Sequence, residues 1–205
     1  MLRHGLVRPS VIPPAPIRAL RELTRYRKTL VQERAAEVNR LQTVRESANL
    51  TLSVVARAIL GASGRDMLNA LVGGAQDAAV LADLARGRLR AKLPALRRAL
   101  DGRVKPYHRT LSTRILAHID FLEESLAQVQ TDSAPHLAPF EEARALVRTI
   151  PGCTGIAAAT LVAEIGVDMN RFPSATHLAS WAGLCPGNKQ SGGKRLSGRL
   201  TKGNP

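Results

Sequence analysis

The sequence predicts a mainly α-helical protein in which long coiled-coil helices are followed by a small helical domain. Two observations lead to this fold class. Apolar residues recur at steps near three, four and seven over residues 17–60, and again from residue 111 to residue 129. This periodicity is typical of helices that pack along a narrow seam. Gly and Pro residues, which interrupt helices, cluster between these two stretches.

The first long helix is expected to follow an irregular lead, residues 1–16, whose prolines oppose helix formation. No proline or glycine interrupts residues 17–60, so one continuous helix is predicted there, with Glu37 and Arg45 among the charges of its polar faces. A helix this long needs a partner for its apolar stripe. That partner is either a second helix of the same chain, in an antiparallel hairpin, or a helix of another chain.

The second long helix is predicted to begin at Pro106, because proline is well tolerated in the first turn of a helix. Between the two long helices, residues 65–104 are expected to form short helices with many basic side chains. We interpret that basic stretch as a phosphate-contact surface in preference to a merely solvated face. The predicted seam of the second helix consists of Leu111, Ile115, Ile119, Leu122, Leu126 and Val129.

The domain organisation follows from these stretches. Residues 17–131 are predicted to form a coiled-coil and basic helical region. The stretch "TDSAPHLAP", Thr131 to Pro139, is expected to be a linker, because turn-forming residues are concentrated in it. Residues 140–205 are then expected to form a separate C-terminal domain.

The charge balance points to a polyanionic partner. The chain has 205 residues, with 30 Lys+Arg against 16 Asp+Glu and a formal net charge of +14. This excess favours a nucleic acid as partner, whereas 3% aromatic residues disfavour binding mainly through base stacking. The two cysteines, Cys153 and Cys185, are far apart and suggest a reducing compartment. No apolar run reaches membrane-span length, so a cytoplasmic protein is expected.

Residues 140–166 are predicted to form two helices joined by a tight turn that contains Pro151, Gly152 and Gly155. The pattern resembles a helix-hairpin-helix motif, which presents backbone N–H groups to a DNA phosphate. Gly155 is expected to permit an unusual backbone angle. The motif's usual second glycine position holds Thr154, so an ordinary pair of packed helices is an equal alternative.

The segment "GNKQSGGKR", Gly187 to Arg195, nearly matches a phosphate-binding P-loop. Asn188 and Arg195 break the required pattern, which argues against nucleotide binding. Glycines around Ser191 would let a DNA phosphate approach closely, and nearby cations would neutralise its charge. The predicted phosphate contacts are Lys189, Lys194, Arg195, Arg199 and Lys202.

No metal site is predicted within the chain. The histidines share no ligand spacing, and the paired glutamates at 123–124 and 141–142 suit helix surfaces better than metal coordination.

Three stretches together resemble one known family: "RELTRYRKTLVQERAAEVNRLQ", "IPGCTGIAAATLVAEIG" and "RFPSATHLASWAGLCPGNKQSGGKRLSGRLTKGNP". This is the insertion-sequence transposase family called one-ten/one-sixteen/nine-oh-two, whose members act as RNA-guided DNA recombinases. The resemblance implies Ser191 as the nucleophile that links to DNA, a guide RNA as partner and a homodimer or higher oligomer. It also implies Mg²⁺ held by the carboxylates of an N-terminal RuvC-like domain.

That RuvC-like domain should precede "LRHGLVRP" in the family, and no acidic residue occurs here before Glu22. The family also continues beyond the position of Pro205. We therefore expect a truncated copy, with no cofactor bound by this chain itself. The leading hypothesis is DNA transposition through Ser191. The alternative is a catalytically inactive, dimerising fragment that binds nucleic acid.

Overall fold

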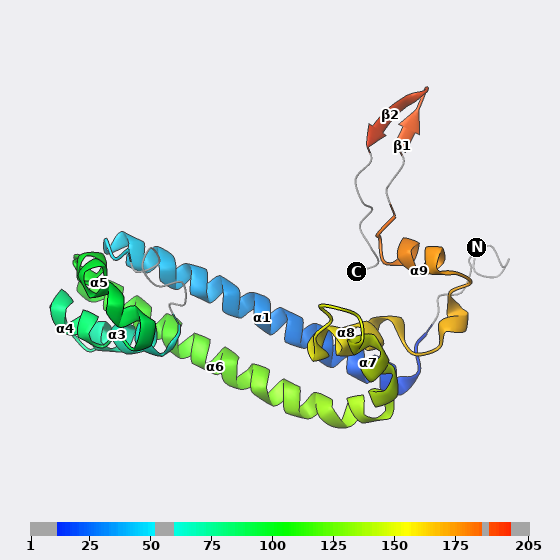
Figure 1. Cartoon of the computed structure of the whole chain (residues 1–205), viewed down its shortest axis with the longest axis horizontal. Helices are drawn as coiled ribbons and strands as arrows, with labels where there is room; N and C mark the ends of the chain where they lie inside the picture. Colours follow the sequence, from blue (N-terminus) through cyan, green and yellow to red (C-terminus); the bar gives the residue numbers. More distant parts are fainter. Residues whose placement is uncertain (1–11, 52–59, 186–188, 198–205) are drawn as a thin grey trace. The chain divides into compact units, whose positions relative to one another are not determined.

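The structure is a computed structural model that describes residues 12–51, 60–185 and 189–197 (Figure 1). Contacts divide the chain into two compact units, of which Ala19–Ala138 is one and the remaining residues are the other. The described residues are mainly helical, with one sheet of two short strands. The mainly α fold class is confirmed.

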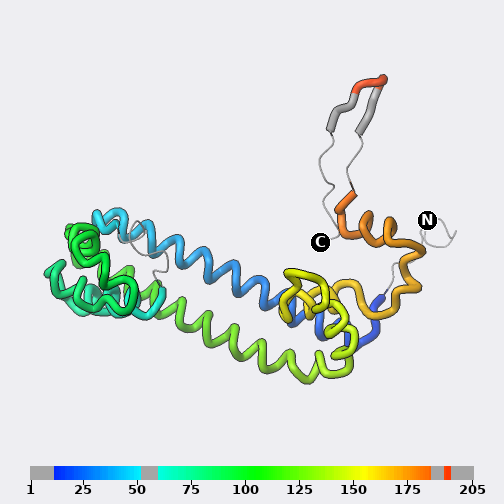
Figure 2. The backbone as a smooth tube through the Cα atoms, viewed as in Figure 1, coloured from blue at the N-terminus to red at the C-terminus, as the bar shows by residue number. Residues whose placement is uncertain are grey.

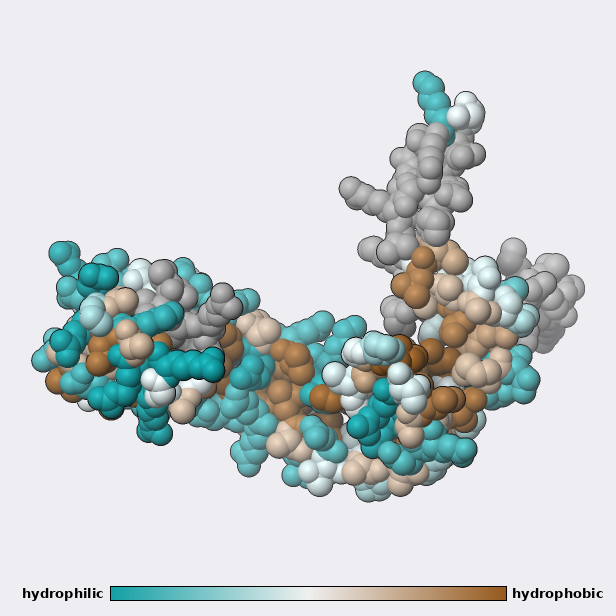
Figure 3. Space-filling model, viewed as in Figure 1, coloured by the Kyte–Doolittle hydropathy of each residue, from teal (hydrophilic) through white to brown (hydrophobic). Residues whose placement is uncertain are grey.

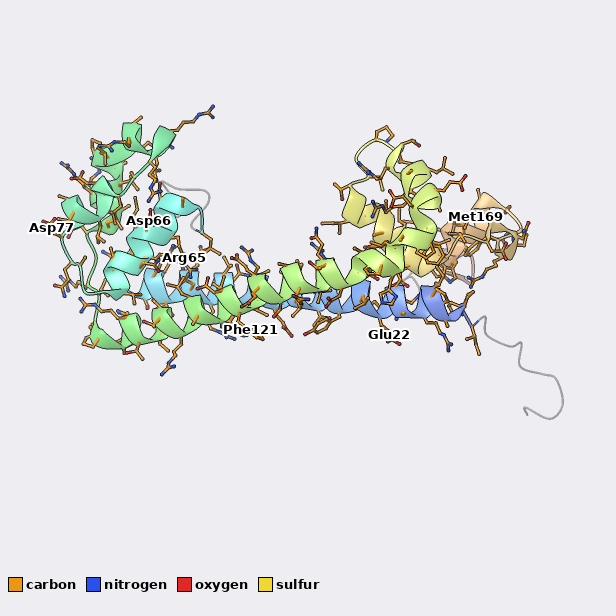
Figure 4. All side chains as sticks on the ribbon, turned by 90° about the horizontal axis from the view of Figure 1, so that it is seen from below. Glu22, Arg65, Asp66, Asp77, Phe121 and Met169 are labelled. Carbon is orange, nitrogen blue, oxygen red and sulfur yellow. The ribbon has the colours of Figure 1, made fainter. Side chains whose placement is uncertain are left out.

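The first unit contains two long antiparallel helices, α1 (Ala15–Ser47) and α6 (Pro106–Leu137), which lie side by side in Figures 1 and 4. Leu30 packs with Leu122 and Val129, whereas Leu41, further along α1, packs with residues earlier in α6. The partner of the first predicted helix is therefore the second helix of the same chain.

The predicted seam of α6 is buried over most of its length. Ile119 and Leu122 are 0% and 1% exposed, and Leu41 of α1 is 0% exposed. Across the two helices, the guanidinium Nε of Arg34 donates a hydrogen bond to Oε1 of Glu123 at 2.8 Å. The prediction for Leu111 was wrong: its side chain is 46% exposed, and His108 and Ser112 are the residues of this turn that are buried.

The first helix is shorter than predicted, because it ends at Ser47 and not near residue 60. Asn49 adopts a left-handed backbone with φ 60°. The N–H of Leu50 donates to the carbonyl of Arg45, and the N–H of Asn49 to that of Glu46, both at 2.9 Å. This is the Schellman arrangement, in which a left-handed residue, here asparagine in place of the more common glycine, satisfies the last carbonyls and ends a helix.

Two charged side chains of α1 that were predicted to lie on polar faces are buried. Glu37 is 7% exposed, and its Oε1 lies 3.3 Å from Nδ1 of His118. Arg45 is 1% exposed, and its guanidinium nitrogens have no hydrogen-bond partner among the described residues. Burial lowers the pKa of Arg45, and the charge of Glu46 opposes this shift.

The predicted linker over Thr131–Pro139 was also wrong for most of its length. Helix α6 continues to Leu137 with Pro135 inside it, and η3 (Ala138–Phe140) follows directly. Pro135 lies in the last turn, where its missing N–H removes a single helical hydrogen bond. Two residues earlier, Ser133 is buried and donates its hydroxyl to the carbonyl of Val129 at 2.6 Å. The helix thus continues through this stretch despite the local preference for a break.

Short helices close the far end of the α1–α6 pair, as predicted for the basic region (Figure 2). Their core includes Met67, Leu81, Leu96 and Leu100, each at most 2% exposed. Pro94 occupies the first turn of the last of these helices. The elements are α3 (Ala62–Val72), α4 (Ala78–Asp83), η2 (Gly87–Lys92) and α5 (Leu93–Leu100).

Gly102 lets the chain after α5 pass close to the end of α1. A Cβ atom at this position would lie 2.6 Å from the carbonyl oxygen of Ala48 and 2.6 Å from Cδ2 of Leu50. The N–H of Arg103 donates to the same Ala48 carbonyl at 2.7 Å. The end of α1 is thus held against the basic region by backbone contact that has no room for a side chain.

Gly102→Ala is expected to destabilise this unit by about 1–3 kcal/mol, because the methyl group would force backbone apart. Gly73→Ala is the matched control, since its Cβ would come no closer than 3.3 Å to any atom. Urea unfolding followed by circular dichroism measures both variants. Equal urea midpoints for the two variants would contradict the close contact between Ala48 and Gly102.

The second unit contains α7 (Glu141–Arg148), α8 (Gly155–Ile165), η4 (Met169–Arg171) and α9 (Ala175–Trp181), followed by strands β1 (Lys189–Ser191) and β2 (Lys194–Ser197). Helix α8 supplies the buried residues Ala158, Ala159, Val162 and Ala163. No helix in the described part of the chain is both long enough and apolar enough to cross a membrane.

Candidate functional site

Ser191 is the last residue of β1 in a two-residue β-hairpin. Strands β1 and β2 pair antiparallel, with Ser191 opposite Lys194 and Gln190 opposite Arg195. The register shifts beyond Gln190, where Lys189 pairs with Ser197. The backbone of Ser191 is therefore held next to the tight turn, directly across from the first residue of β2.

The two glycines of the motif form this turn. Gly192 has φ 55° and Gly193 has φ 75°, the left-handed values that a type I′ hairpin turn requires at both central positions. A residue with a Cβ atom adopts such angles only at a cost. Gly192 and Gly193 are thus accounted for by hairpin geometry, whereas Gly187 lies outside the described residues. The C-terminal domain, expected to be helical, also contains two strands.

The predicted cations around Ser191 are described to different extents. Lys194 is exposed. For Lys189, Ser191 and Arg195 the structure describes the backbone, which lies in the hairpin. Arg199 and Lys202 lie outside the described residues. Lys189 therefore lies on the same strand as Ser191, and Lys194 and Arg195 lie on the strand paired with it.

The helical hairpin α7–α8 has the predicted form of two helices joined by a tight turn. Gly152 has φ 83°, which favours glycine. The prediction that Gly155 has an unusual backbone angle was wrong, because its φ is not positive and it is the first residue of α8. Thr154 is the N-cap of α8, and its hydroxyl oxygen accepts a hydrogen bond from the Ala157 N–H at 3.2 Å. The threonine at the motif's usual second glycine position therefore has a capping role.

The apolar stripe of α7 is incompletely covered. Leu146 is 71% exposed and Ile150, just beyond the helix, is 55% exposed. No residue of α7 is buried. The buried residues of this helix pair are all in α8.

Helix α9 connects the helical part of this unit to the hairpin and has a side-chain cap at its N-terminus. The hydroxyl oxygen of Ser174 accepts a hydrogen bond from the His177 N–H at 3.4 Å. Gly183, with φ 72°, follows the helix end. Trp181 packs edge-on against Phe172 with ring centroids 5.8 Å apart. These contacts define where the chain leaves the helix before β1.

No three His, Cys, Asp or Glu side chains in the described ranges are grouped so as to hold a metal ion. None of the described residues thus forms a site for Mg²⁺, which the family resemblance places at the carboxylates of an N-terminal RuvC-like domain.

The C-terminal residues match a known family model. The model of the "Transposase IS116/IS110/IS902 family" covers residues 144–205, from within α7 through the β-hairpin. Residues 144–205 are thus similar to a transposase domain of that family. Most of α7, all of α8 and Ser191 lie within the matched residues.

A curated relative agrees with this assignment. The transposase for insertion sequence element IS1328 of Yersinia enterocolitica is 34% identical over 89 residues. The match spans 43% of this chain and 26% of the relative, so the chain covers about a quarter of that protein's length. No solved structure matches the chain.

Sequence reasoning missed the strands on either side of Gly192-Gly193. The signal was present, because a Gly-Gly pair between short polar runs is a hairpin signature. It was overlooked because "KQS" and "KRLS" are too short and too polar to show the alternation of a buried strand.

Proposed function

We propose that the chain acts in DNA transposition and that its transposase domain exchanges DNA strands with Ser191 as the nucleophile. One observation carries the proposal: Ser191 stands beside a two-glycine turn, opposite Lys194, within the residues that match the transposase family. A small turn without side chains allows a bulky phosphodiester to approach the strand end. A cation across the ladder favours the charge that develops on the phosphate oxygens.

The chemical step is a transesterification. The serine oxygen forms a bond to phosphorus, and the bond between phosphorus and one sugar oxygen breaks. The serine hydroxyl loses its proton to solvent, and the leaving sugar oxygen takes up a proton. Because the phosphodiester energy is kept in the serine–phosphate bond, a second DNA end can later displace the serine. Such reversal is what strand exchange requires.

The phosphate contacts proposed around this step lie on two elements. In the β-hairpin they are Lys189, Lys194 and Arg195, and beyond it Arg199 and Lys202. In the helical hairpin, the turn at Gly152 and the first amides of α8 at Gly155 would face a DNA phosphate in the manner of a helix-hairpin-helix motif. Thr154 already binds the Ala157 amide, which leaves the earlier amides of that turn for the phosphate.

Further partners of the reaction are part of the same proposal. Guide RNA would select the DNA, a homodimer or higher oligomer would hold two DNA ends, and Mg²⁺ would be supplied with the carboxylates of a RuvC-like domain. The α1–α6 seam is satisfied within one chain, so it does not by itself require a second copy.

Ser191→Ala is expected to abolish a covalent protein–DNA adduct. Wild-type chain is incubated with labelled DNA, guide RNA and Mg²⁺, and the adduct is resolved on a denaturing gel. Ser197→Ala is the matched control, because it removes a hydroxyl from the other strand of the same hairpin. Loss in the first variant and retention in the second supports the nucleophile.

A wild-type chain that forms no adduct under these conditions, but binds DNA with a steep salt dependence, would support the alternative of an inactive nucleic-acid-binding protein. Equal adduct yields for wild type and Ser191→Ala would rule out Ser191 as the attacking group.

A further inference from the structure

A dense group of exposed cations lies at the end of the first unit, outside the transposase domain. We call it the basic cap: η2, α5 and the segment that leads from α5 to α6, residues 87–105. Figure 3 shows this end of the unit to be largely hydrophilic. Its exposed basic side chains include Arg88, Arg90, Lys92, Arg98, Arg103 and Lys105.

These six cations are not neutralised within the described part of the chain. Two neighbouring arginines are neutralised by acids. Arg86 pairs with Asp66 at 2.5 Å, and Arg97 pairs with Asp83 at 3.5 Å. None of the six takes part in an ion pair among the described residues. Between Leu84 and Lys105 the sequence has one acid, Asp101.

The α1–α6 pair has a different charge pattern. It carries 10 Lys+Arg against 8 Asp+Glu, whereas residues 87–105 carry 7 against 1. Two of its ion pairs are Arg34 with Glu123 and Arg40 with Glu37. Arg65, where α3 meets α6, pairs with Asp120 (Figure 4). The uncompensated charge is therefore concentrated in the cap and does not merely reflect the basic composition of the whole chain.

A folded scaffold holds the cap in place. Leu96 and Leu100 of α5 are 0% and 2% exposed and belong to the core that also contains Leu81 of α4. A cavity of about 240 Å³ lies beside Leu100, with Gln76, Arg103 and Lys105 in its lining. The cations thus project from an ordered surface, and two of them border a recess in which their fields add.

We propose that the basic cap binds the phosphate backbone of a nucleic acid, as a site separate from Ser191. Uncompensated Arg and Lys side chains on an ordered surface attract phosphates and release the counterions bound to them. An anionic membrane fits less well, because among the cap's described side chains none is an exposed large hydrophobic that could insert into lipid. The proposal does not depend on the chemistry proposed for Ser191.

The test is fluorescence anisotropy with the full chain and labelled duplexes over a range of salt concentrations. The cap variant is R88Q/R90Q/K92Q, all in η2. The matched control is R18Q/K28Q/R114Q, which neutralises three exposed cations elsewhere on α1 and α6. Glutamine preserves helix propensity, and both variants lose the same net charge. Equal thermal midpoints would show that both remain folded.

The cap variant is expected to lose tenfold or more in affinity, and its slope of log K against log salt should fall by about 3 relative to wild type. The control should keep the wild-type slope. A DNA duplex and an RNA duplex of the same sequence form two arms, and the arm with the larger loss identifies the nucleic acid.

Equal losses in the cap and control variants would overturn the proposal, because overall charge would then explain binding. Vesicles of anionic lipid form a third arm. A loss of affinity in the cap variant that is confined to these vesicles would also overturn the proposal. Adduct formation at Ser191 is scored separately, so failure of the cap and failure of the nucleophile give different results.

Discussion

Replacing Gly192 and Gly193 together with valine is expected to disrupt the β-hairpin and to remove the covalent DNA adduct. Both positions have positive φ, at 55° and 75°, and a β-branched residue in such a conformation costs about 1–3 kcal/mol. A hairpin of two short strands has little stability to offset this, so Ser191 would lose its place beside the turn. Adduct yield on a denaturing gel gives the result.

Gly192→Asn is the matched control for the turn. Asparagine tolerates the left-handed region, and Asn-Gly is a preferred pair in type I′ turns. This variant should therefore keep most of the adduct yield. Wild-type yield from the double valine variant would mean that the turn has no part in placing Ser191.

Leu41→Ala is expected to lower the free energy of unfolding of the first unit by about 2–5 kcal/mol. Leu41 is 0% exposed and packs with Leu68, Ile115 and Ile119, so it joins both long helices to α3. Its loss leaves a cavity where three elements meet. Chemical denaturation followed by the helical circular dichroism signal measures this change in the free energy of unfolding.

Val31→Ala is the control on the same helix, because Val31 is 42% exposed and belongs to none of the described core clusters. It should change stability by about 0.5 kcal/mol or less. Comparable losses for the two variants would show that the α1–α6 seam does not stabilise the unit in the way described.

The helices could be predicted where periodicity and burial agree. Ile119 and Leu122 recur at the spacing of a packed seam and are buried against α1. The start of α6 at Pro106 followed from the local preference of proline for the first turn. In both cases the local signal and the tertiary contact favour the same structure.

Predictions failed where a single residue or a distant contact decides the structure. Asn49 ends α1 through its left-handed backbone, although no proline or glycine marks the position. Pro135 remains inside α6, in whose last turn its missing N–H removes only one helical hydrogen bond. Arg45 is buried although its type favours the surface. The hydrophobic periodicity of a single sequence does not predict these features.

The choice of Ser191 as candidate nucleophile stays a prediction, whereas the backbone of its segment differs from the helical domain that was expected. Ser191 and the surrounding glycines were singled out by their chemistry, and the family match includes them. Their arrangement as a β-hairpin depends on two φ angles at Gly192 and Gly193, which neither the near P-loop pattern nor the helical context indicated. The basic cap was visible as a charge run, but its ordered surface depends on the packing of Leu96 and Leu100.

The most direct test of the central claim is to map the site of the DNA adduct. The wild-type chain is incubated with DNA, guide RNA and Mg²⁺, the DNA is trimmed with nuclease, and the protein is digested and analysed by tandem mass spectrometry. The account predicts a nucleotide joined to Ser191, in the peptide that contains Gly192 and Gly193. A nucleotide found on another residue, such as Tyr26 or Tyr107, or no adduct at all, would contradict it.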